Sequence, residues 1–308
     1  MIPEERSKTI RTLSEKAGFD YCGFAPASVL SAEIDPYRRW IEKKHWGSME
    51  YLHRDYSRRL DPRQIMAESR TVIALLAGYF PERQIPREDN YILSRYAVGK
   101  DYHVRIKDML DTMTGEMEKE FPGILCRSFV DSGVLMEKAW AQQCGLGWRG
   151  KNTLLINPEH GSWFFIGIIL TDLETAWDNP GQDRCGACDR CLNACPTGAL
   201  EAPHVLNPLK CIAYQTIESK EELPADLREK FNDRIYGCDL CQEVCPYNRK
   251  PLIKDNPDCA PSQDLMFLRK HDWDSLTPEQ FKTLFHHTPV KRIGYEKLMR
   301  NIRFVSGK

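Results

Sequence analysis

Two cysteine-rich motifs constrain this chain more than any other feature of its 308 residues. The first, CGACDRCLNACP, starts at Cys185 and carries four cysteines, and the second, CDLCQEVCP, starts at Cys238 and carries three. A cubic 4Fe–4S cluster needs four thiolates, and the spacing C-x₂-C-x₂-C places three of them on one loop. The chain is therefore expected to fold one segment around two such clusters.

The proline after the last cysteine of each motif indicates how the motifs share their ligands. In ferredoxins with two clusters, the cysteine before this proline ligates the other cluster. By that rule the second cluster still lacks one ligand, and Cys211 is the remaining cysteine between the motifs. The predicted ligands are Cys185, Cys188, Cys191 and Cys245 for the first cluster, and Cys195, Cys211, Cys238 and Cys241 for the second.

Structural zinc is the alternative, because C-x₂-C pairs also hold tetrahedral Zn²⁺. Two pairs would be enough for zinc, which leaves the two cysteine–proline endings unexplained. The four cysteines that are not predicted ligands are expected to be buried apolar residues. They are Cys22, Cys126, Cys144 and Cys259.

The distribution of cysteines also predicts the domain organisation. Eight of the twelve lie between residues 185 and 245, and the turn-rich stretch DNPGQD precedes them. Upstream, helix and strand patterns alternate, as in a mixed α/β domain. The predicted fold class is α+β, with a mixed α/β domain over 1–177, a ferredoxin-like domain over 178–250 and a helical segment over 251–308.

Local patterns predict the individual elements. Apolar residues spaced three and four apart predict helices over 4–17 and 102–118, and a third helix that ends near Gln143. Residues 264–304 are also predicted to be helical. Apolar runs predict the strands of a central sheet over 71–80, 124–130, 153–156 and 162–170.

Charge and targeting signals exclude several classes of protein. With 43 Lys and Arg against 44 Asp and Glu, the net charge is −1, so contact with RNA is expected only at local patches. The N-terminus has neither the apolar core of a signal peptide nor a twin-arginine pair. A cytoplasmic protein without membrane contact is expected, and since no pattern indicates a large apolar interface, a monomer is expected.

The predicted iron–sulfur clusters would carry electrons, but common cofactor motifs do not identify the group that accepts them. GLGWRG at 145–150 has the wrong glycine spacing for a dinucleotide-binding loop, and the sequence has no P-loop. DYHVRI begins like the corrinoid-binding motif D-x-H-x-x-G but ends in Ile106. Spacing alone therefore leaves the acceptor open.

Longer stretches of the chain resemble the epoxyqueuosine reductases. The similar stretches are SRYAVGKDYH (94–103), SFVDSGVLMEKAWAQQCGLGWRGKNTLLI (128–156), GSWFFIG (161–167), CIAYQTIE with the cysteine motifs, and TPVKRIGYEKLMRNIRF (288–304). The resemblance implies reduction of epoxyqueuosine to queuosine at the wobble position of tRNA, the last step of queuosine biosynthesis. It also implies base-off cobalamin in the 1–177 domain, a fold like that of reductive dehalogenases and nitroreductases, and cobalamin charged by two 4Fe–4S clusters.

Asp131 matches the proton donor that this resemblance implies. It lies between a predicted strand and a predicted helix, where an Asp commonly caps the helix, so capping is the alternative role. An acid that works near neutral pH needs a raised pKa. Burial or the reduced corrin is expected to raise the pKa of Asp131.

The resemblance also implies cobalamin contacts, because corrin amides and the phosphate of the cofactor suit cationic and amide side chains. Solvated loop charges are the alternative for the cationic positions. The matched positions are Asp131, Arg149, Lys151, Asn152 and Ser162, with Arg54, Tyr96, Gln215 and Asp239 as further candidates.

Two basic clusters are the expected tRNA-binding surfaces, with simple solvation as the alternative. Longer family members continue into helical repeats that help to hold tRNA, whereas this chain ends at Lys308. Its own patches are expected to suffice, and the alternative is weaker, more salt-sensitive binding. The first cluster is Arg54, Arg58, Arg59 and Arg63, and the second is Lys291, Arg292, Lys297, Arg300 and Arg303. The expected contacts are Arg58, Arg59, Lys291, Arg292 and Arg300.

Two other classes share these motifs. A corrinoid reductive dehalogenase has a similar architecture but usually carries a twin-arginine export signal. A non-enzymatic electron carrier needs only the cysteine segment and leaves the preceding residues without a role. In each case an unidentified low-potential electron donor is an expected partner.

Overall fold

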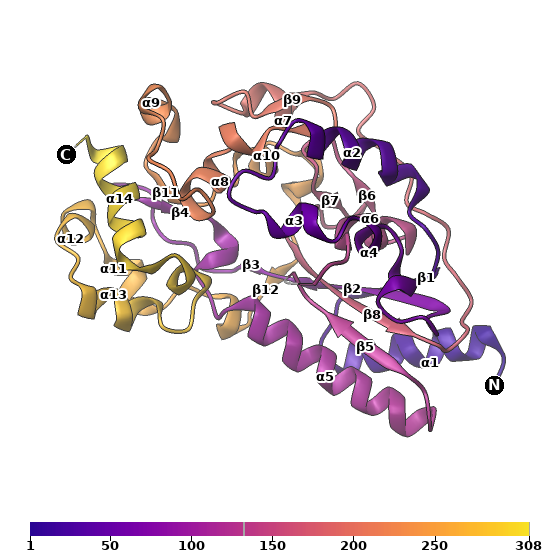
Figure 1. The fold of residues 1–308 in the computed structure, drawn as a ribbon. Coiled ribbons are helices and arrows are strands. Elements are labelled where there is room, and N and C mark those ends of the chain that lie inside the picture. Colours follow the sequence, from indigo (N-terminus) through magenta and orange to yellow (C-terminus); the bar gives the residue numbers. More distant parts are fainter. Residues whose placement is uncertain (132, 308) are drawn as a thin grey trace.

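A computed structural model describes residues 1–131 and 133–307 of the chain. At its centre lies a four-stranded antiparallel sheet in the order β1–β2–β8–β5 (Figure 1). The strands are β1 (Tyr21–Pro26), β2 (Thr71–Gly78), β8 (Phe164–Thr171) and β5 (Cys126–Phe129).

The central strand β2 is buried on both faces because its alternate side chains enter two different cores. Leu75 packs with α1 (Pro3–Lys16) and α5 (Tyr102–Glu120) on one face of the sheet. Leu76 packs with α6 (Glu137–Gln143) on the other face. The sheet is thus the middle layer of three, with α5 below it and α6 above it in Figure 1.

Further short elements cover the α6 face or connect the layers. They are α2 (Ile34–Glu42), α3 (Tyr51–Arg54), α4 (Tyr56–Leu60), β3 (Phe80–Pro81), β4 (Ile92–Leu93), β6 (Trp148–Arg149) and β7 (Leu155–Ile156). The cysteine-rich segment contains α7 (Arg190–Ala194), β9 (Leu200–Ala202), β10 (Val205–Leu206), α8 (Ile212–Ile217), α9 (Arg228–Phe231), β11 (Arg234–Tyr236) and α10 (Leu240–Glu243). After it come β12 (Ile253–Lys254), α11 (Gln263–Phe267), α12 (Lys270–Asp274), α13 (Pro278–Phe285) and α14 (Gly294–Ser306).

The structure confirms most of the predicted elements. The helices predicted over 4–17 and 102–118 are α1 and α5, and three of the four predicted strands are β2, β5 and β8. The assignment of 153–156 to the central sheet is wrong, because β7 pairs only with β6 in a separate ribbon.

Strand β1 was not predicted, since Gly23 and Pro26 interrupt its apolar pattern. It forms because it pairs with β2 along its whole length. Gly23 is required there, since a Cβ atom would lie 2.0 Å from the backbone oxygen of Cys144.

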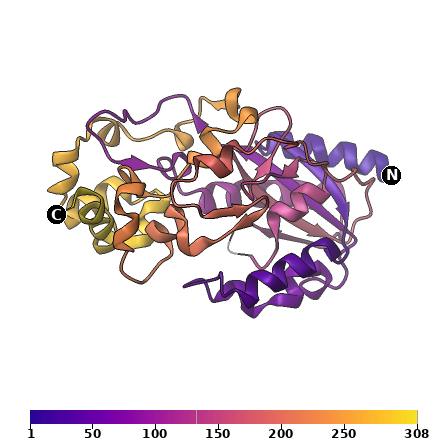
Figure 2. The same ribbon diagram turned by 90° about the horizontal axis from the view of Figure 1, so that it is seen from above.

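The packing crosses the predicted domain boundaries. Strand β4 pairs with β11, and β3 pairs with β12, so the segment after β2 lies with the C-terminal half of the chain. Tyr91 and Leu93 share one core with Trp273 and Phe285. The division into 1–177, 178–250 and 251–308 stays a prediction. The two termini lie at opposite ends of the molecule (Figures 1 and 2).

Within the described part of the chain, no helix combines the length and apolarity that a bilayer span requires.

The two-sided burial of β2 makes a stability prediction. Leu75 is 0% exposed, so Leu75→Ala removes buried methyl groups and leaves a cavity. The expected cost is about 2–5 kcal/mol of the free energy of unfolding, measured by denaturant titration. The matched control is Leu125→Ala, because Leu125 is 47% exposed and the expected change is within about 0.5 kcal/mol. Equal losses in the two variants would contradict this account of the core.

Candidate active site

Asp131 lies in the loop between β5 and α6, with its backbone in the left-handed region at a φ of 48°. Its carboxylate accepts a hydrogen bond from the Tyr102 hydroxyl and lies 3.1 Å from Nε2 of His103. Both partners belong to the first turn of α5. Helix α6 has Met136 as its N-cap residue, so the alternative role of Asp131 as its cap is wrong.

His103 lies between two carboxylates. Its Nδ1 is 2.7 Å from Oδ1 of Asp101, and its Nε2 faces Asp131. The hydrogen bond with Asp131 is the main reason that the pKa of His103 is raised, and burial opposes it. Because both ring nitrogens face carboxylate oxygens, the geometry suits the doubly protonated imidazolium.

Tyr102 is held by the central sheet. Its ring stacks on Phe165 of β8, with ring centroids 4.5 Å apart. Burial, followed by the charge of Asp131, raises the pKa of Tyr102, so its hydroxyl keeps its proton and donates it. The sheet therefore fixes the group that orients the Asp131 carboxylate.

The structure corrects the expectation for the pKa of Asp131. Burial raises this pKa, but hydrogen bonds from His103 and Tyr102 and the charges of His103 and Arg292 outweigh burial and lower it. The prediction of a raised pKa is therefore wrong. The physical reason is that the Asp131 side chain is 54% exposed while two donors stabilise its ionised form.

Glu137 is a second carboxyl group at this site. It opens α6, and its Oε1 accepts a hydrogen bond from the backbone N–H of Asp131. Burial, followed by the negative charge of Asp131, raises the pKa of Glu137 to about 8. Two neighbouring carboxyl groups thus have pKa values shifted in opposite directions, the pattern of an acid–base pair.

The sequence analysis missed three of these residues. Tyr102 and His103 belong to the DYH sequence, which begins like a corrinoid motif and ends a matched stretch, but neither residue was assigned a role. Glu137 lies in a matched stretch, but its spacing from Asp131 forms no recognised motif. The proximity of α5 to the loop after β5 could not be read from the sequence.

Asp131 and Glu137 line a cavity of about 390 Å³. Arg59, Arg149 and His204 also line it, beside aromatic and aliphatic side chains. Arg149 forms an ion pair with Glu33 across 2.6 Å. The buried Nε of Arg59 has no hydrogen-bond partner among the described residues.

Three of the predicted cobalamin-binding residues contact the cysteine segment instead of lining this cavity. Lys151 donates to a backbone carbonyl of the first cysteine loop over 2.7 Å. Asn152 donates to the carbonyl of Cys241 over 3.3 Å, and the Ser162 hydroxyl donates to Gln242 over 3.0 Å. These contacts join the segment after α6 to both cysteine motifs.

The four remaining candidates lie in different surroundings. Asp239 is buried and accepts a hydrogen bond from the backbone N–H of Arg95 over 2.8 Å, and burial raises its pKa. The buried Oε1 of Gln215 has no hydrogen-bond partner among the residues that the structure describes. The ring of Tyr96 packs near that of Tyr102, whereas Arg54 is exposed and pairs with a neighbouring glutamate.

The thiols of the cysteine motifs form a first group around Cys245. Burial raises the pKa of Cys245, and the nearby thiols of Cys185 and Cys188 raise it further. The pKa of Cys191 is raised by burial and then by Cys185 and Cys245. The indole N–H of Trp148 donates to Sγ of Cys185 over 3.4 Å.

The other four thiols form a second group. Burial raises the pKa of Cys238 to about 12, and the thiol of Cys211 contributes to this rise. The pKa of Cys241 is raised by burial, Cys238 and Cys211, and that of Cys211 by burial and Cys195. Cys191 of the first group also raises the pKa of Cys241, so the two groups adjoin. The assignment of these thiols as cluster ligands stays a prediction.

Among the described residues, no group of three or more His, Cys, Asp or Glu side chains is arranged to hold a single metal ion. Of the cysteines outside the motifs, Cys22, Cys144 and Cys259 are buried as expected, while Cys126 is only partly buried.

The structure gives several predicted tRNA-binding residues internal partners. Arg300 donates to the backbone carbonyls of Gln215 and Glu221, over 2.9 and 2.8 Å. Arg59 is buried, whereas Arg292 is half exposed and paired with Glu218. The remaining two residues are exposed or partly exposed, Lys291 at the surface and Arg58 beside Asp55.

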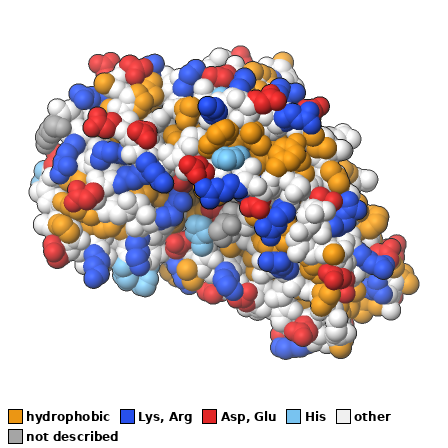
Figure 3. All heavy atoms as spheres, viewed as in Figure 1, with side chains coloured by type: hydrophobic (Ala, Val, Ile, Leu, Met, Phe, Trp, Pro, Cys, Tyr) orange, Lys and Arg blue, Asp and Glu red, His pale blue; other side chains and the backbone are white. Residues whose placement is uncertain are grey.

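Lys and Arg side chains gather over the α8 and α14 side of the face shown in Figure 3, with acidic side chains between them. This mixed charge agrees with local patches of positive potential and not with a continuous basic surface.

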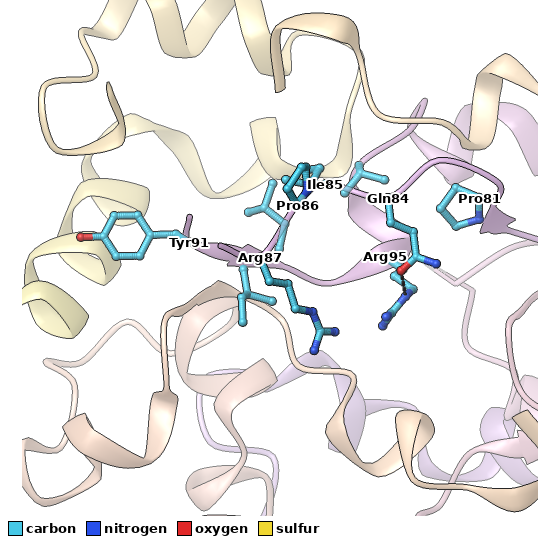
Figure 4. Close-up of a pocket in the computed structure, with 10 residues that line it drawn as sticks. Pro81, Gln84, Ile85, Pro86, Arg87, Tyr91 and Arg95 are labelled. Carbon is cyan, nitrogen blue, oxygen red and sulfur yellow. Dashed lines mark hydrogen bonds between the residues drawn. The ribbon is translucent and has the colours of Figure 1, made fainter. Parts of the chain in front are cut away.

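A smaller cavity of about 40 Å³ lies beside β4 (Figure 4). There Nε of Arg95 donates to Oε1 of Gln84 over 3.1 Å. Arg95 also pairs with Asp239 and Glu243, which flank Cys241 in the second motif. This arginine therefore ties the segment after β2 to the cysteine segment.

Known protein families match both the cysteine segment and the region that leads up to Asp131. A family model described as "4Fe-4S double cluster binding domain" matches residues 184–248. A second, described as "Epoxyqueuosine reductase QueG, DUF1730", matches residues 59–132. The overall fold also resembles that of the catabolic reductive dehalogenase NpRdhA, with a TM-score of 0.53 at 15% identity over 98% of this chain and 38% of that one. Fold and site together define an iron–sulfur oxidoreductase with a mixed α/β domain.

More similar proteins narrow this class. The epoxyqueuosine reductase of Cyclobacterium marinum is 38% identical over 99% of this chain and 98% of its own length. A crystal structure of epoxyqueuosine reductase with an epoxyqueuosine-modified tRNA stem loop superimposes with a TM-score of 0.90, at 29% identity over 98% of this chain and 80% of that one. A Bacillus subtilis epoxyqueuosine reductase, with its catalytic aspartate loop swung out of the active site, gives 0.89 at 28% identity, over 98% and 81% of the two chains. The chain belongs to the epoxyqueuosine reductase family.

The contact between Asp131 and His103 makes a prediction about titration. His103 is expected to titrate above its ordinary pKa of 6.5, because Asp131 stabilises the imidazolium. Asp131→Asn removes that charge and is expected to lower the pKa of His103, as measured by NMR titration of the imidazole. Asp172→Asn, at the far end of β8, is the control and is expected to leave the titration unchanged. An unchanged pKa of His103 in the Asp131 variant would contradict the assigned contact.

Proposed function

We propose that this protein reduces epoxyqueuosine in tRNA to queuosine, the last step of queuosine biosynthesis. The observation that carries the proposal is the Asp131 carboxylate, held by Tyr102 and His103 beside a cavity in a chain of this family. The reaction removes the epoxide oxygen as water and forms a carbon–carbon double bond. It consumes two electrons and two protons.

Two 4Fe–4S clusters are proposed to supply the electrons. The donor set fits them, because the thiols lie close enough to affect one another's pKa, and backbone N–H groups stabilise several of the thiolates. The proposed ligands are Cys185, Cys188, Cys191 and Cys245 for one cluster, and Cys195, Cys211, Cys238 and Cys241 for the other. The clusters would be reduced by a low-potential donor that is not yet identified.

Base-off cobalamin is the proposed cofactor between the clusters and the substrate. Buried polar atoms without partners among the described residues, Nε of Arg59 and Oε1 of Gln215, fit the amides at the corrin edge. When bound, the cofactor supplies a strongly reducing cobalt nucleophile. The residues proposed to hold it are Arg54, Tyr96, Asp131, Arg149, Lys151, Asn152, Ser162, Gln215 and Asp239.

Asp131 is the proposed proton donor to the substrate oxygen. Since its pKa is lowered and that of His103 is raised, the proton is stored on His103 and passes to the Asp131 carboxylate across 3.1 Å. Asp101 stabilises the imidazolium from the other side, and Tyr102 orients the carboxylate. General acid catalysis of this kind typically contributes about 10²–10⁴-fold to a rate.

The modified base is proposed to leave the anticodon loop and enter the cavity, because unstacked bases in RNA loops can be drawn into a pocket. Arg292 lies near enough to Asp131 to lower its pKa, and half of its side chain is exposed, which suits a contact with an adjacent phosphate. The proposed contacts with tRNA are Arg58, Arg59, Lys291, Arg292 and Arg300. Arg59 and Arg300 would contribute mainly by holding the surrounding backbone.

The proposed ligand set predicts the iron content of variants. Anaerobically reconstituted wild-type protein is expected to hold about eight iron atoms per chain. Cys245→Ser removes one proposed ligand of the first cluster, so iron is expected to fall by up to about half and the broad cluster absorption to weaken. The control is Cys126→Ser, outside both groups, with wild-type iron content. Full iron in the Cys245 variant, or zinc in the wild type, would contradict the assignment.

The function is tested with anaerobic protein, cobalamin, a chemical reductant and tRNA that carries epoxyqueuosine. Nucleoside mass spectrometry is expected to show queuosine with the wild type, and about 10²–10⁴-fold slower formation with Asp131→Asn. The variant should keep both clusters and bound cob(II)alamin, as its absorption spectrum will show.

Each outcome of this assay has a clear meaning. Bound cobalamin without queuosine would contradict the proposed substrate and favour another reductive reaction, such as dehalogenation. Cluster absorption without bound cobalamin would favour an electron carrier. A wild-type rate in Asp131→Asn would exclude the role of Asp131.

A further inference from the structure

The proposed reaction needs two protons. Asp131 and His103 together supply one of them, because His103 stores a single proton that Asp131 passes on. Both protons end on the same oxygen atom. The first converts the epoxide oxygen into a hydroxyl as one C–O bond breaks. The second converts the hydroxyl into water as the other C–O bond breaks and the C=C bond forms, while the reduced iron–sulfur clusters supply the two electrons.

Glu137 lies where a second acid is needed. Its Oε1 accepts a hydrogen bond from the backbone N–H of Asp131, so the two residues are direct neighbours. Both side chains line the cavity of about 390 Å³. A group in that cavity can therefore be reached from two carboxyl groups.

We propose that Glu137 is the second proton donor of this site and protonates the oxygen that leaves as water. This inference rests on the proposed function. It assigns Asp131 and Glu137 successive roles toward one substrate atom.

The charges around Glu137 support this role. Burial and then the negative charge of Asp131 raise the pKa of Glu137, while the Asp131 N–H, Lys138 of α6 and His103 of α5 lower it. Together these effects place it at about 8. Tyr102 of α5 is neutral, and the ion pair of Arg149 and Glu33 lies on the same cavity wall. Glu137 is therefore protonated at neutral pH, when Asp131 is ionised.

A purely structural role for Glu137 makes a different prediction. If it served only to hold the Asp131 backbone through its Oε1 atom, Glu137→Gln would keep that acceptor and the activity. If Glu137 delivers a proton, the glutamine variant fails in the reaction although the loop is held.

The first experiment compares the wild type, Glu137→Gln and Glu137→Asp in single-turnover assays with an epoxyqueuosine-containing tRNA stem loop across a pH series. Wild-type product formation is expected to fall as the pH rises through about 8, since Glu137 then loses its proton. Glu137→Gln is expected to be slower by about 10²-fold or more and to lose the part of the alkaline fall that Glu137 causes, while the part caused by His103 stays. Glu137→Asp is expected to regain part of the rate. Bound cob(II)alamin and stem-loop affinity are expected to match the wild type.

The second experiment needs neither cofactor nor substrate. Infrared difference spectra of the unloaded protein are expected to show a protonated carboxyl band at neutral pH that is lost as the pH rises through about 8. The band should be missing in Glu137→Gln and kept in Glu120→Gln, a control at the exposed end of α5.

The outcomes separate this inference from the proposed function. If the wild type forms no queuosine, the proposed function fails and the inference fails with it. If the wild type is active and Glu137→Gln keeps its rate and its alkaline limb, only the inference is overturned. The lack of a carboxyl band that depends on Glu137 would also overturn it.

Discussion

The hydrogen bonds from the first turn of α5 to Asp131 connect the central sheet to the site. Helix α5 is fixed by Ile106 and Leu110, which are buried against the sheet, and the Tyr102 ring stacks on β8. A residue with a φ of 48° in an exposed loop is thereby held by partners that cannot move independently of the core. The contacts of Asp131 with Tyr102, His103 and Glu137 hold this residue beside the cavity.

The same region brings charge and thiols together. Lys138, which lines the cavity, is close enough to both Asp131 and Cys241 for each to affect its pKa. The second thiol group therefore lies on the cavity side of the cysteine segment, and Cys191 of the first group adjoins it through Cys241.

The sequence predicted local elements of the fold better than the environment of the acids. The assignment of eight cysteines to two clusters rests on motif spacing and on Cys211 as the remaining cysteine between the motifs, and it stays a prediction. The helices α1 and α5 and the strands β2 and β8 followed from apolar periodicity. By contrast, β1 depends on pairing with β2, and the pKa of Asp131 depends on two donors from a distant helix.

The contacts of basic residues were also beyond what the sequence could predict. Arg300 belonged to a predicted tRNA-binding patch, yet it donates to backbone carbonyls of the α8 region, which sequence periodicity does not reveal. Glu137 carried no motif, and only the fold brings it to Asp131.

The central claim is that carboxyl groups and iron–sulfur clusters of this protein act together to remove oxygen from a modified nucleoside of tRNA. The most direct test is made in the source organism. Total tRNA from a strain that lacks this gene would be digested and analysed by nucleoside mass spectrometry. Accumulated epoxyqueuosine with loss of queuosine, reversed by the wild-type gene, is the predicted result. An unchanged level of queuosine in the deletion strain would contradict the account.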